Sequence, residues 1–185
     1  MSNAWKHFKT ITKHRHLVMW HCFRVGLYRR GLLHDLSKYG WTEFRVGVRY
    51  YQGTRSPNAA EREIEGYSTA WMHHKGRNKH HFEYWTDILP GTRVYGPVPM
   101  PTEYLVESVM DRIAACKVYR GAAYADGDAL AYLERALDSE MLHPETLRKL
   151  QYLLTMLRDQ GEKATFRFIR TVVLKGLPFG EGEVY

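Results

Sequence analysis

An adjacent histidine and aspartate, His34 and Asp35, are the residues of this sequence that point most directly to chemistry. They stand in the stretch GLLHDLSKYG, residues 31–40, with Lys38 three positions after the aspartate. Imidazole nitrogen and carboxylate oxygen together suit a borderline-to-hard divalent metal such as Mn, Fe, Co or Zn better than a metal that prefers thiolates. The pair therefore predicts part of a metal site.

The histidines of the chain gather in its first half, where they offer further metal ligands. Of the ten histidines, nine lie within the first 81 residues, and four of them form the adjacent pairs His73-His74 and His80-His81. A metal site needs several nitrogen and oxygen donors from separate elements to meet at one point. Spacing alone does not decide which member of each pair would bind the metal.

Further candidate ligands lie in segments with helical spacing. His14 and His21 are seven residues apart, so they share one face of a helix, and either can be the first ligand. Asp111 is a lone acid inside an apolar helical stretch. These groups indicate a buried polar centre where several helices meet. The remaining histidines are expected at the surface: His7, His16 and His143.

The elements that must position these groups are all predicted to be helices. Apolar residues recur at three- and four-residue steps, and Gly and Pro separate the periodic segments. The predicted helices are 5–30, 32–38, 42–52, 58–75, 102–120, 127–138, 143–160 and 161–174. The helix at 32–38 carries the His-Asp pair. Residues 88–101, rich in Pro and Gly, are predicted to form an extended loop that covers the site as a flap, and no strand is expected.

This pattern predicts an all-α fold. A chain of 185 residues fits a single domain with a proper core. We expect that domain to span residues 1–175, with a motif-bearing core at about 10–120 and C-terminal helices at 127–174. Residues 176–185 are expected to be a flexible tail.

The cysteines and the apolar segments narrow the class of protein. Cys22 and Cys116 lie in apolar helical patterns without CxxC spacing, which favours buried free thiols and a reducing compartment. No apolar run approaches the roughly 20 residues needed to span a bilayer. The N-terminal sequence has no signal-peptide pattern. We therefore expect a cytoplasmic protein without a membrane partner.

The net charge of +7 favours an anionic partner. The basic residues are scattered, and no helix carries a long basic stripe. A phosphorylated small molecule or nucleotide accounts for the charge as well as a polynucleotide does. Nucleic acid is a possible partner but is not favoured, and the oligomeric state is not predicted.

The motifs resemble those of the HD-domain superfamily of metal-dependent phosphohydrolases. GLLHDLSK is similar to the superfamily signature LLHDIGK, including the lysine, and VMDRIAA is similar to the downstream motif that supplies the last aspartate. HHKGRNKHHFEYW resembles the extra-histidine insertion of the branch that binds two metals. The sequence is most similar to a small uncharacterised bacterial and phage family with the motifs GLLHDLSK and HHxxxNxHHxEYW. The resemblance covers about residues 10–120.

The resemblance implies an HD-domain-like helical bundle with its metal site in a cleft between helices. One or two divalent ions are implied, with Mn, Fe, Co, Ni, Zn or Mg as candidates. The implied ligands are His14, His34, Asp35, His74, His81 and Asp111. The alternates are His21 for the first ligand and His73 and His80 for the paired positions.

The activity implied is hydrolysis of a phosphomonoester or nucleotide through metal-activated water, with Asp35 and Lys38 as catalytic residues. The residues expected to bind the substrate are Lys38, Arg77, Asn78, Lys79 and Lys117. Two alternatives remain open. The first is a diiron-type oxygenase on the same scaffold. The second is a non-catalytic binding module in which metal only staples the helices together.

Overall fold

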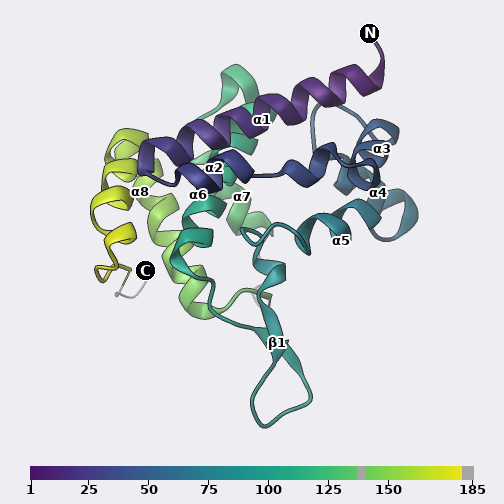
Figure 1. Ribbon diagram of the computed structural model, residues 1–185. Helices are drawn as coiled ribbons and strands as arrows, with labels where there is room; N and C mark the ends of the chain where they lie inside the picture. The colour runs from purple at the N-terminus through teal and green to yellow at the C-terminus, as the bar shows by residue number, and fades with distance from the viewer. Residues whose placement is uncertain (137–140, 181–185) are drawn as a thin grey trace.

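The computed structural model describes residues 1–136 and 141–180, and α-helices account for most of this part of the chain (Figure 1). The prediction of an all-α fold is confirmed. Besides eight α-helices and short 3₁₀ turns, the described residues contain one small two-stranded sheet. None of their helices is both long and apolar enough to cross a membrane.

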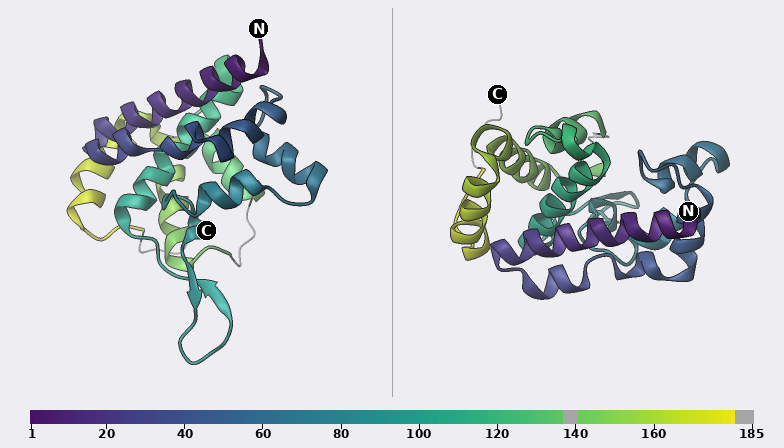
Figure 2. Two further views of the ribbon diagram at one scale, coloured as in Figure 1. Left: turned by 45° about the vertical axis from the view of Figure 1, so that its right-hand side comes forward. Right: turned by 90° about the horizontal axis from the view of Figure 1, so that it is seen from above.

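The first two helices lie side by side and run in opposite directions (Figures 1 and 2). α1 (Asn3–Val25) ends at Gly26, whose φ of 94° is the left-handed conformation that glycine adopts without strain. The chain then turns back into α2 (Tyr28–Leu33). The single helix predicted at 5–30 is therefore wrong. Gly31, expected to be a helix stop, instead lies inside α2, where an added Cβ would be 2.9 Å from Cβ of Cys22.

The predicted helix at 32–38 is also wrong, because the His-Asp pair lies in a non-helical link. This link joins α2 to the 3₁₀ turn η1 (Leu36–Tyr39). Asp35 has a φ of 55°, a left-handed conformation that is uncommon outside glycine, asparagine and aspartate. This backbone turn buries both His34 and Asp35, with exposed fractions of 2% and 1%.

Three short helices follow beside the N-terminal half of α1: α3 (Trp41–Arg49), α4 (Pro57–Glu65) and α5 (Thr69–Lys75) (Figure 1). The single helix predicted at 58–75 is wrong, since Gly66 ends α4 with a φ of 82°. Ser68 then caps α5, and its hydroxyl also donates to Glu61. A small apolar cluster holds the three helices together: Val46, Tyr50, Ala60 and Ala70.

A β-hairpin occupies most of the segment predicted to be a flap. After the 3₁₀ turn η2 (Phe82–Tyr84), β1 (Thr86–Ile88) pairs antiparallel with β2 (Tyr95–Pro97). The hairpin projects away from the helices (Figures 1 and 2). The expectations of no strand and of a flap over the site are therefore wrong.

The remaining helices follow the predicted boundaries more closely. α6 (Thr102–Arg120) matches the prediction and leads through η3 (Gly121–Ala123) to α7 (Asp128–Ala136). α8 (Pro144–Thr171) is interrupted at Gly161, where two helices were predicted to meet, and η5 (Val173–Lys175) follows it. The predicted end of the 127–138 helix and residues 181–185 of the predicted tail lie outside the described residues.

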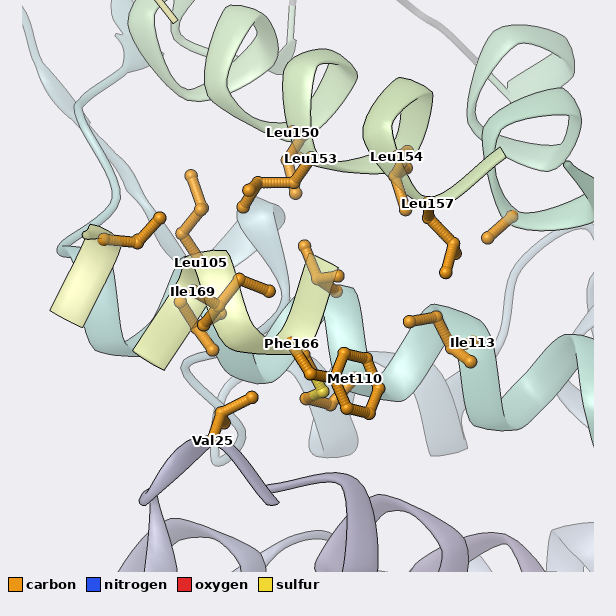
Figure 3. Packing of buried hydrophobic residues seen from close by; sticks show 14 of the residues in the cluster. Val25, Leu105, Met110, Ile113, Leu150, Leu153, Leu154, Leu157, Phe166 and Ile169 are labelled. Atoms are coloured by element: carbon orange, nitrogen blue, oxygen red, sulfur yellow. The ribbon is translucent and has the colours of Figure 1, made fainter. Parts of the chain in front are cut away.

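The main hydrophobic core lies between α1, α6, α7 and α8. Leucines of α8 point toward apolar residues of α6 and of the end of α8 (Figure 3). The labelled residues are Val25, Leu105, Met110, Ile113, Leu150, Leu153, Leu154, Leu157, Phe166 and Ile169. Both cysteines are free thiols, as predicted, and Cys22 belongs to this core. Since α1 also contacts α3, it connects the main core to the smaller cluster of α3–α5.

Candidate metal centre

Four side chains from three parts of the chain converge on one point. α1 contributes His14, the link after α2 contributes His34 and Asp35, and α6 contributes Asp111. Each offers a donor atom, and these atoms all lie within 4.8 Å of one another. Nε2 of His14 lies 2.9 Å from Oδ1 of Asp111, and Nε2 of His34 lies 3.3 Å from Oδ2 of Asp35. We call these four residues the first cluster.

A second cluster is built on the same aspartate. It contains Asp35, His74 from α5, and His80 and His81 from the turn that follows α5, again with donor atoms within 4.8 Å of one another. Oδ1 of Asp35 lies 3.3 Å from Nε2 of His74 and 3.6 Å from Nε2 of His80. Asp35 thus presents one oxygen to each cluster, which is the arrangement of a carboxylate that bridges two ions.

Most of the potential ligand atoms of the two clusters have no hydrogen-bond partner. Nε2 of every clustered histidine is buried without a hydrogen bond: His14, His34, His74, His80 and His81. Oδ1 of Asp35 is likewise buried without a hydrogen-bond partner. Buried polar atoms are normally hydrogen-bonded, because desolvating them without a partner costs free energy. Five unpaired imidazole nitrogens around a carboxylate fit divalent metal, which takes such donors as ligands.

Glu107, on α6, contacts Nδ1 of two imidazole rings, on the side of each ring away from the cluster. Nδ1 of His34 donates to Oε1 of Glu107 at 2.9 Å, and Nδ1 of His80 lies 3.3 Å from the same oxygen. Burial opposes the charge on Glu107, but its contacts with His34 and His80 lower the pKa of the carboxyl group to about 2. With the proton on Nδ1, the lone pair of Nε2 faces the cluster. Carboxylates commonly orient metal-binding histidines in this way.

Glu43, on α3, plays the same part for the second cluster. Nδ1 of His74 donates to Oε2 of Glu43 at 2.8 Å, while Nδ1 of His73 donates to Oε1 at 2.7 Å. Burial raises the pKa of Glu43, but its hydrogen bond and charge interaction with His74 and its hydrogen bond with His73 together outweigh burial, so the pKa falls. The carboxylate therefore fixes the tautomer of His74.

The electrostatics favour metal-binding protonation states at Asp35, His80 and His81 but not at His34 and His74. Burial would raise the pKa of Asp35, but His34 and Lys38 hold it well below its usual range. Burial and the neighbouring imidazoles lower the pKa of His80 and of His81, so both rings are neutral near pH 7. Metals bind carboxylates and neutral imidazoles, so these groups need lose no proton first. Burial lowers the pKa of His34 and of His74, but the charge of Asp35 and hydrogen bonds to carboxylates raise both, so a metal ion would compete with a proton at these two rings.

A cavity of about 580 Å³ gives access to the clusters. It is lined by His14, Lys38, His74, His81 and Asp111, among others from α1, α3, α6 and α7. The ammonium group of Lys38 donates to Oδ2 of Asp35, which fixes the lysine at the cluster side of the cavity. Aromatic side chains also contribute to the walls: Tyr51, Trp71, Phe82, Tyr119 and Tyr132.

The structure separates the alternates that spacing left open. His14 lies in the first cluster, whereas His21 lies against Phe166 and 3.4 Å from Nζ of Lys117. His74 lies in the second cluster, whereas His73 belongs to neither cluster and contacts Glu43. Both members of the pair His80-His81 join the second cluster, although only one was expected to do so.

Of the five residues predicted to bind substrate, only Lys38 lines the cavity. Asn78 is buried, and its amide donates to Oγ of Ser37 and to the carbonyl of His74. Arg77 and Lys79 are exposed. Lys117 pairs with Glu162. Through its two hydrogen bonds, the side-chain amide of Asn78 stabilises the turn between His74 and His80.

Sequence reasoning missed three further residues of the site. Glu107 precedes Asp111 by four positions and so shares its face of α6, a signal that the helical pattern contained. Arg112, which lines the cavity, directly follows Asp111. The sequence around Glu43 contains no comparable signal, because Glu43 of α3 contacts histidines of α5 that lie 30 and 31 residues further along the chain. His7, expected at the surface, is buried beside Phe44 and lines the cavity, whereas His16 is exposed as predicted.

Comparison with known proteins places the chain in a family without assigning it an activity. No curated protein and no solved structure matches the chain. A family model described as "Family of unknown function (DUF5662)" matches residues 3–156, which include every residue of both clusters and both supporting glutamates. The chain therefore belongs to DUF5662, a family of unknown function.

Proposed function

We propose that this protein is a metal-dependent phosphohydrolase of the HD type that acts on a phosphomonoester or nucleotide. The observation that carries the proposal is the convergence of five unpaired, buried imidazole nitrogens on the two oxygens of Asp35. The resemblance of GLLHDLSK and VMDRIAA to HD-superfamily motifs supports it independently, since both motifs contribute residues to the first cluster.

Each cluster is assigned one divalent ion in this proposal. His14, His34, Asp35 and Asp111 hold the first, and a second ion has its own set of ligands: Asp35, His74, His80 and His81. Nitrogen and oxygen donors without a thiolate suit Mn, Fe, Co, Ni or Zn, and Mg suits the oxygen-rich first cluster. Asp35, which has one oxygen facing each cluster, would be a ligand of both ions.

Bound metal would supply a water of lowered pKa, near about 7, and would polarise a phosphoryl oxygen. The chain's own residues hold the reacting groups in place. Asp35 accepts a hydrogen bond from Lys38 and so fixes that ammonium group beside the clusters. From there Lys38 stabilises negative charge on the phosphoryl oxygens as it builds up. Glu107 and Glu43 keep His34 and His74 in the tautomer that directs Nε2 inward.

The test combines metal analysis with an activity screen. Protein purified without chelator is analysed for metal atoms per chain and then assayed on a panel of phosphoesters with Mn, Co, Ni and Mg. We expect bound metal and hydrolysis of at least one ester. His14→Ala should lose the first ion and the hydrolysis, whereas His16→Ala should retain both, because His16 is exposed on the same helix.

Two other outcomes would overturn the proposal. Iron-loaded protein with visible absorption and no hydrolysis would indicate an oxygenase on this scaffold. Metal whose removal lowers the melting temperature, in a protein that hydrolyses no ester, would indicate a non-catalytic module that metal holds together.

A further inference from the structure

One face of α6 lines the cavity along most of the length of the helix. Its residues recur at three- and four-residue steps: Ser108, Asp111, Arg112, Ala115, Cys116 and Tyr119. Asp111 belongs to the first cluster, and Arg112 is the next residue on the same stripe. The stripe therefore places a guanidinium group in the cavity directly beside the residues that face the metal.

Arg112 has no counter-charge within ion-pair distance among the described residues, and its Nε is buried without a hydrogen-bond partner. Two other arginines of the same cavity are neutralised. Arg55 pairs with Glu63 at 2.5 Å, and Arg120 pairs with Asp128 at 2.8 Å. Lys38 is paired with Asp35. Arg112 is thus a cation of this cavity whose charge the protein leaves uncompensated.

Glu83, which lines the same cavity, is one candidate for a counter-charge. Its Oε2 is also buried without a hydrogen-bond partner, and the two side chains form no ion pair. Arg112 is half-buried and its Nε is shielded from solvent, so leaving this charge without a partner costs free energy. An anion that enters the cavity would account for a guanidinium group in this position. Arginine suits such an anion because its planar fork can donate two parallel hydrogen bonds to phosphate oxygens.

We propose that Arg112 forms the phosphate-binding subsite of this cavity and that the ligand is a terminal phosphate dianion. The inference rests on the proposed function, because it takes a phosphomonoester as the substrate. A terminal phosphate has three non-bridging oxygens, so it can contact Arg112, Lys38 and the metal-facing side of the cavity together. A phosphodiester has two such oxygens, so Arg112 selects monoesters over diesters.

The experiment measures binding of inorganic phosphate to metal-loaded protein by calorimetry, with the metal content of every variant determined in parallel. We expect Arg112→Met to weaken phosphate binding by about 10- to 100-fold, the range typical of losing hydrogen bonds to a charged group. Arg112→Lys keeps the positive charge but loses the planar guanidinium group, so its affinity for phosphate should lie between those of the wild type and Arg112→Met. Arg120→Met is the matched control, because Arg120 lines the same cavity but is paired with Asp128, and it should bind phosphate like the wild type.

Metal content and a normal thermal transition show that Arg112→Met and Arg112→Lys are folded. Equal phosphate affinity in Arg112→Met and wild type would overturn the subsite, as would a metal-loaded wild type that binds no phosphate. Phosphate binding that depends on Arg112 in a protein without hydrolytic activity would support the subsite while the proposed function fails. Where the protein does hydrolyse esters, Arg112→Met should raise KM for monoesters by the same factor and leave KM for diesters unchanged. An unchanged KM for monoesters would overturn the subsite and leave the proposed function standing.

Discussion

Nε2 of His74 and Oδ1 of Asp35 lie 3.3 Å apart, and neither atom has a hydrogen-bond partner among the described residues. Both residues are 1% exposed, so bulk solvent hardly reaches them. Two facing polar atoms that are left unpaired inside a protein need a third atom between them. A divalent metal ion would be such an atom, because it takes both imidazole nitrogen and carboxylate oxygen as ligands.

Replacing Asp35 by asparagine removes the charge and one oxygen from the centre of both clusters. Asparagine tolerates the left-handed backbone at this position, so the fold should persist. Removing the hydrogen-bond partner of a metal ligand typically weakens metal binding by up to about 100-fold. Because Asp35 is itself a proposed ligand, we expect Asp35→Asn to weaken metal binding by more than about 100-fold. Metal titration of the purified variant checks this, and undiminished affinity would rule out a bridging role.

Replacing Glu107 by glutamine should weaken metal binding without removing a ligand. The carboxylate of Glu107 accepts from Nδ1 of His34, and an amide can present its nitrogen there instead. A loss of about 10- to 100-fold in metal affinity is expected. Glu103→Gln is the control, since Glu103 is one turn away on α6 and contacts Arg30 but no clustered histidine. Equal effects of the two substitutions would contradict the role of Glu107.

Gly31 controls how closely the link carrying His34 approaches α1. A Cβ at this position would lie 2.9 Å from Cβ of Cys22 and 3.1 Å from Cα of Met19. We expect Gly31→Ala to lower the free energy of unfolding by about 1–3 kcal/mol, the usual cost of overpacking. Gly76→Ala, whose Cβ would meet its nearest atom at 3.4 Å, should be nearly neutral. Denaturant unfolding of both variants tests the difference.

His21 should make stability depend on pH in the acid range. Burial, together with the charge of Lys117, lowers the pKa of His21 from 6.5 to about 4. The unfolded chain therefore binds more protons between these values, so His21 costs no stability above pH 6.5 and progressively more as the pH falls toward 4. The slope is at most about 1.4 kcal/mol per pH unit. His21→Gln should reduce the difference in unfolding free energy between pH 7 and pH 5, and an unchanged difference would contradict this account.

The residues of the first cluster were accessible from the sequence because each stands in a strong local signal. His34, Asp35 and Asp111 lie in motifs of recognisable composition, and His14 lies on a helix face. The all-α class followed from hydrophobic periodicity for the same reason. The long apolar stripes of α6 and α8 left little ambiguity about their boundaries.

The errors arose where one residue changes the direction of the backbone. Gly26 and Gly66 end helices that periodicity alone would continue, and Asp35 adopts a left-handed conformation that no local pattern announces. The prediction included three residues of the second cluster but gave His80 only as an alternative to His81, because His80 and His81 lie in a turn, where neighbouring side chains can face the same point. In a helix they would diverge by about 100°. Glu43 acts across helices, and its role requires the packing itself.

Contacts at the end of the described chain show a further limit of sequence patterns. Phe179, within the segment expected to be a tail, lies beside Tyr152 and Phe168 of α8. Scattered apolar residues among Gly, Pro and Glu give no periodicity in this segment. The partners of Phe179 can be identified only once α8 is in place.

The central claim is that two clusters share Asp35 and hold two divalent ions. The most direct test is the number of metal atoms per chain, measured by elemental analysis after the protein has been loaded with Mn and freed of unbound metal. We predict two atoms per chain in the wild type, and one in His81→Ala, because His81 belongs only to the second cluster. A wild type that holds no metal, or a His81→Ala variant that still holds two atoms, would contradict the account.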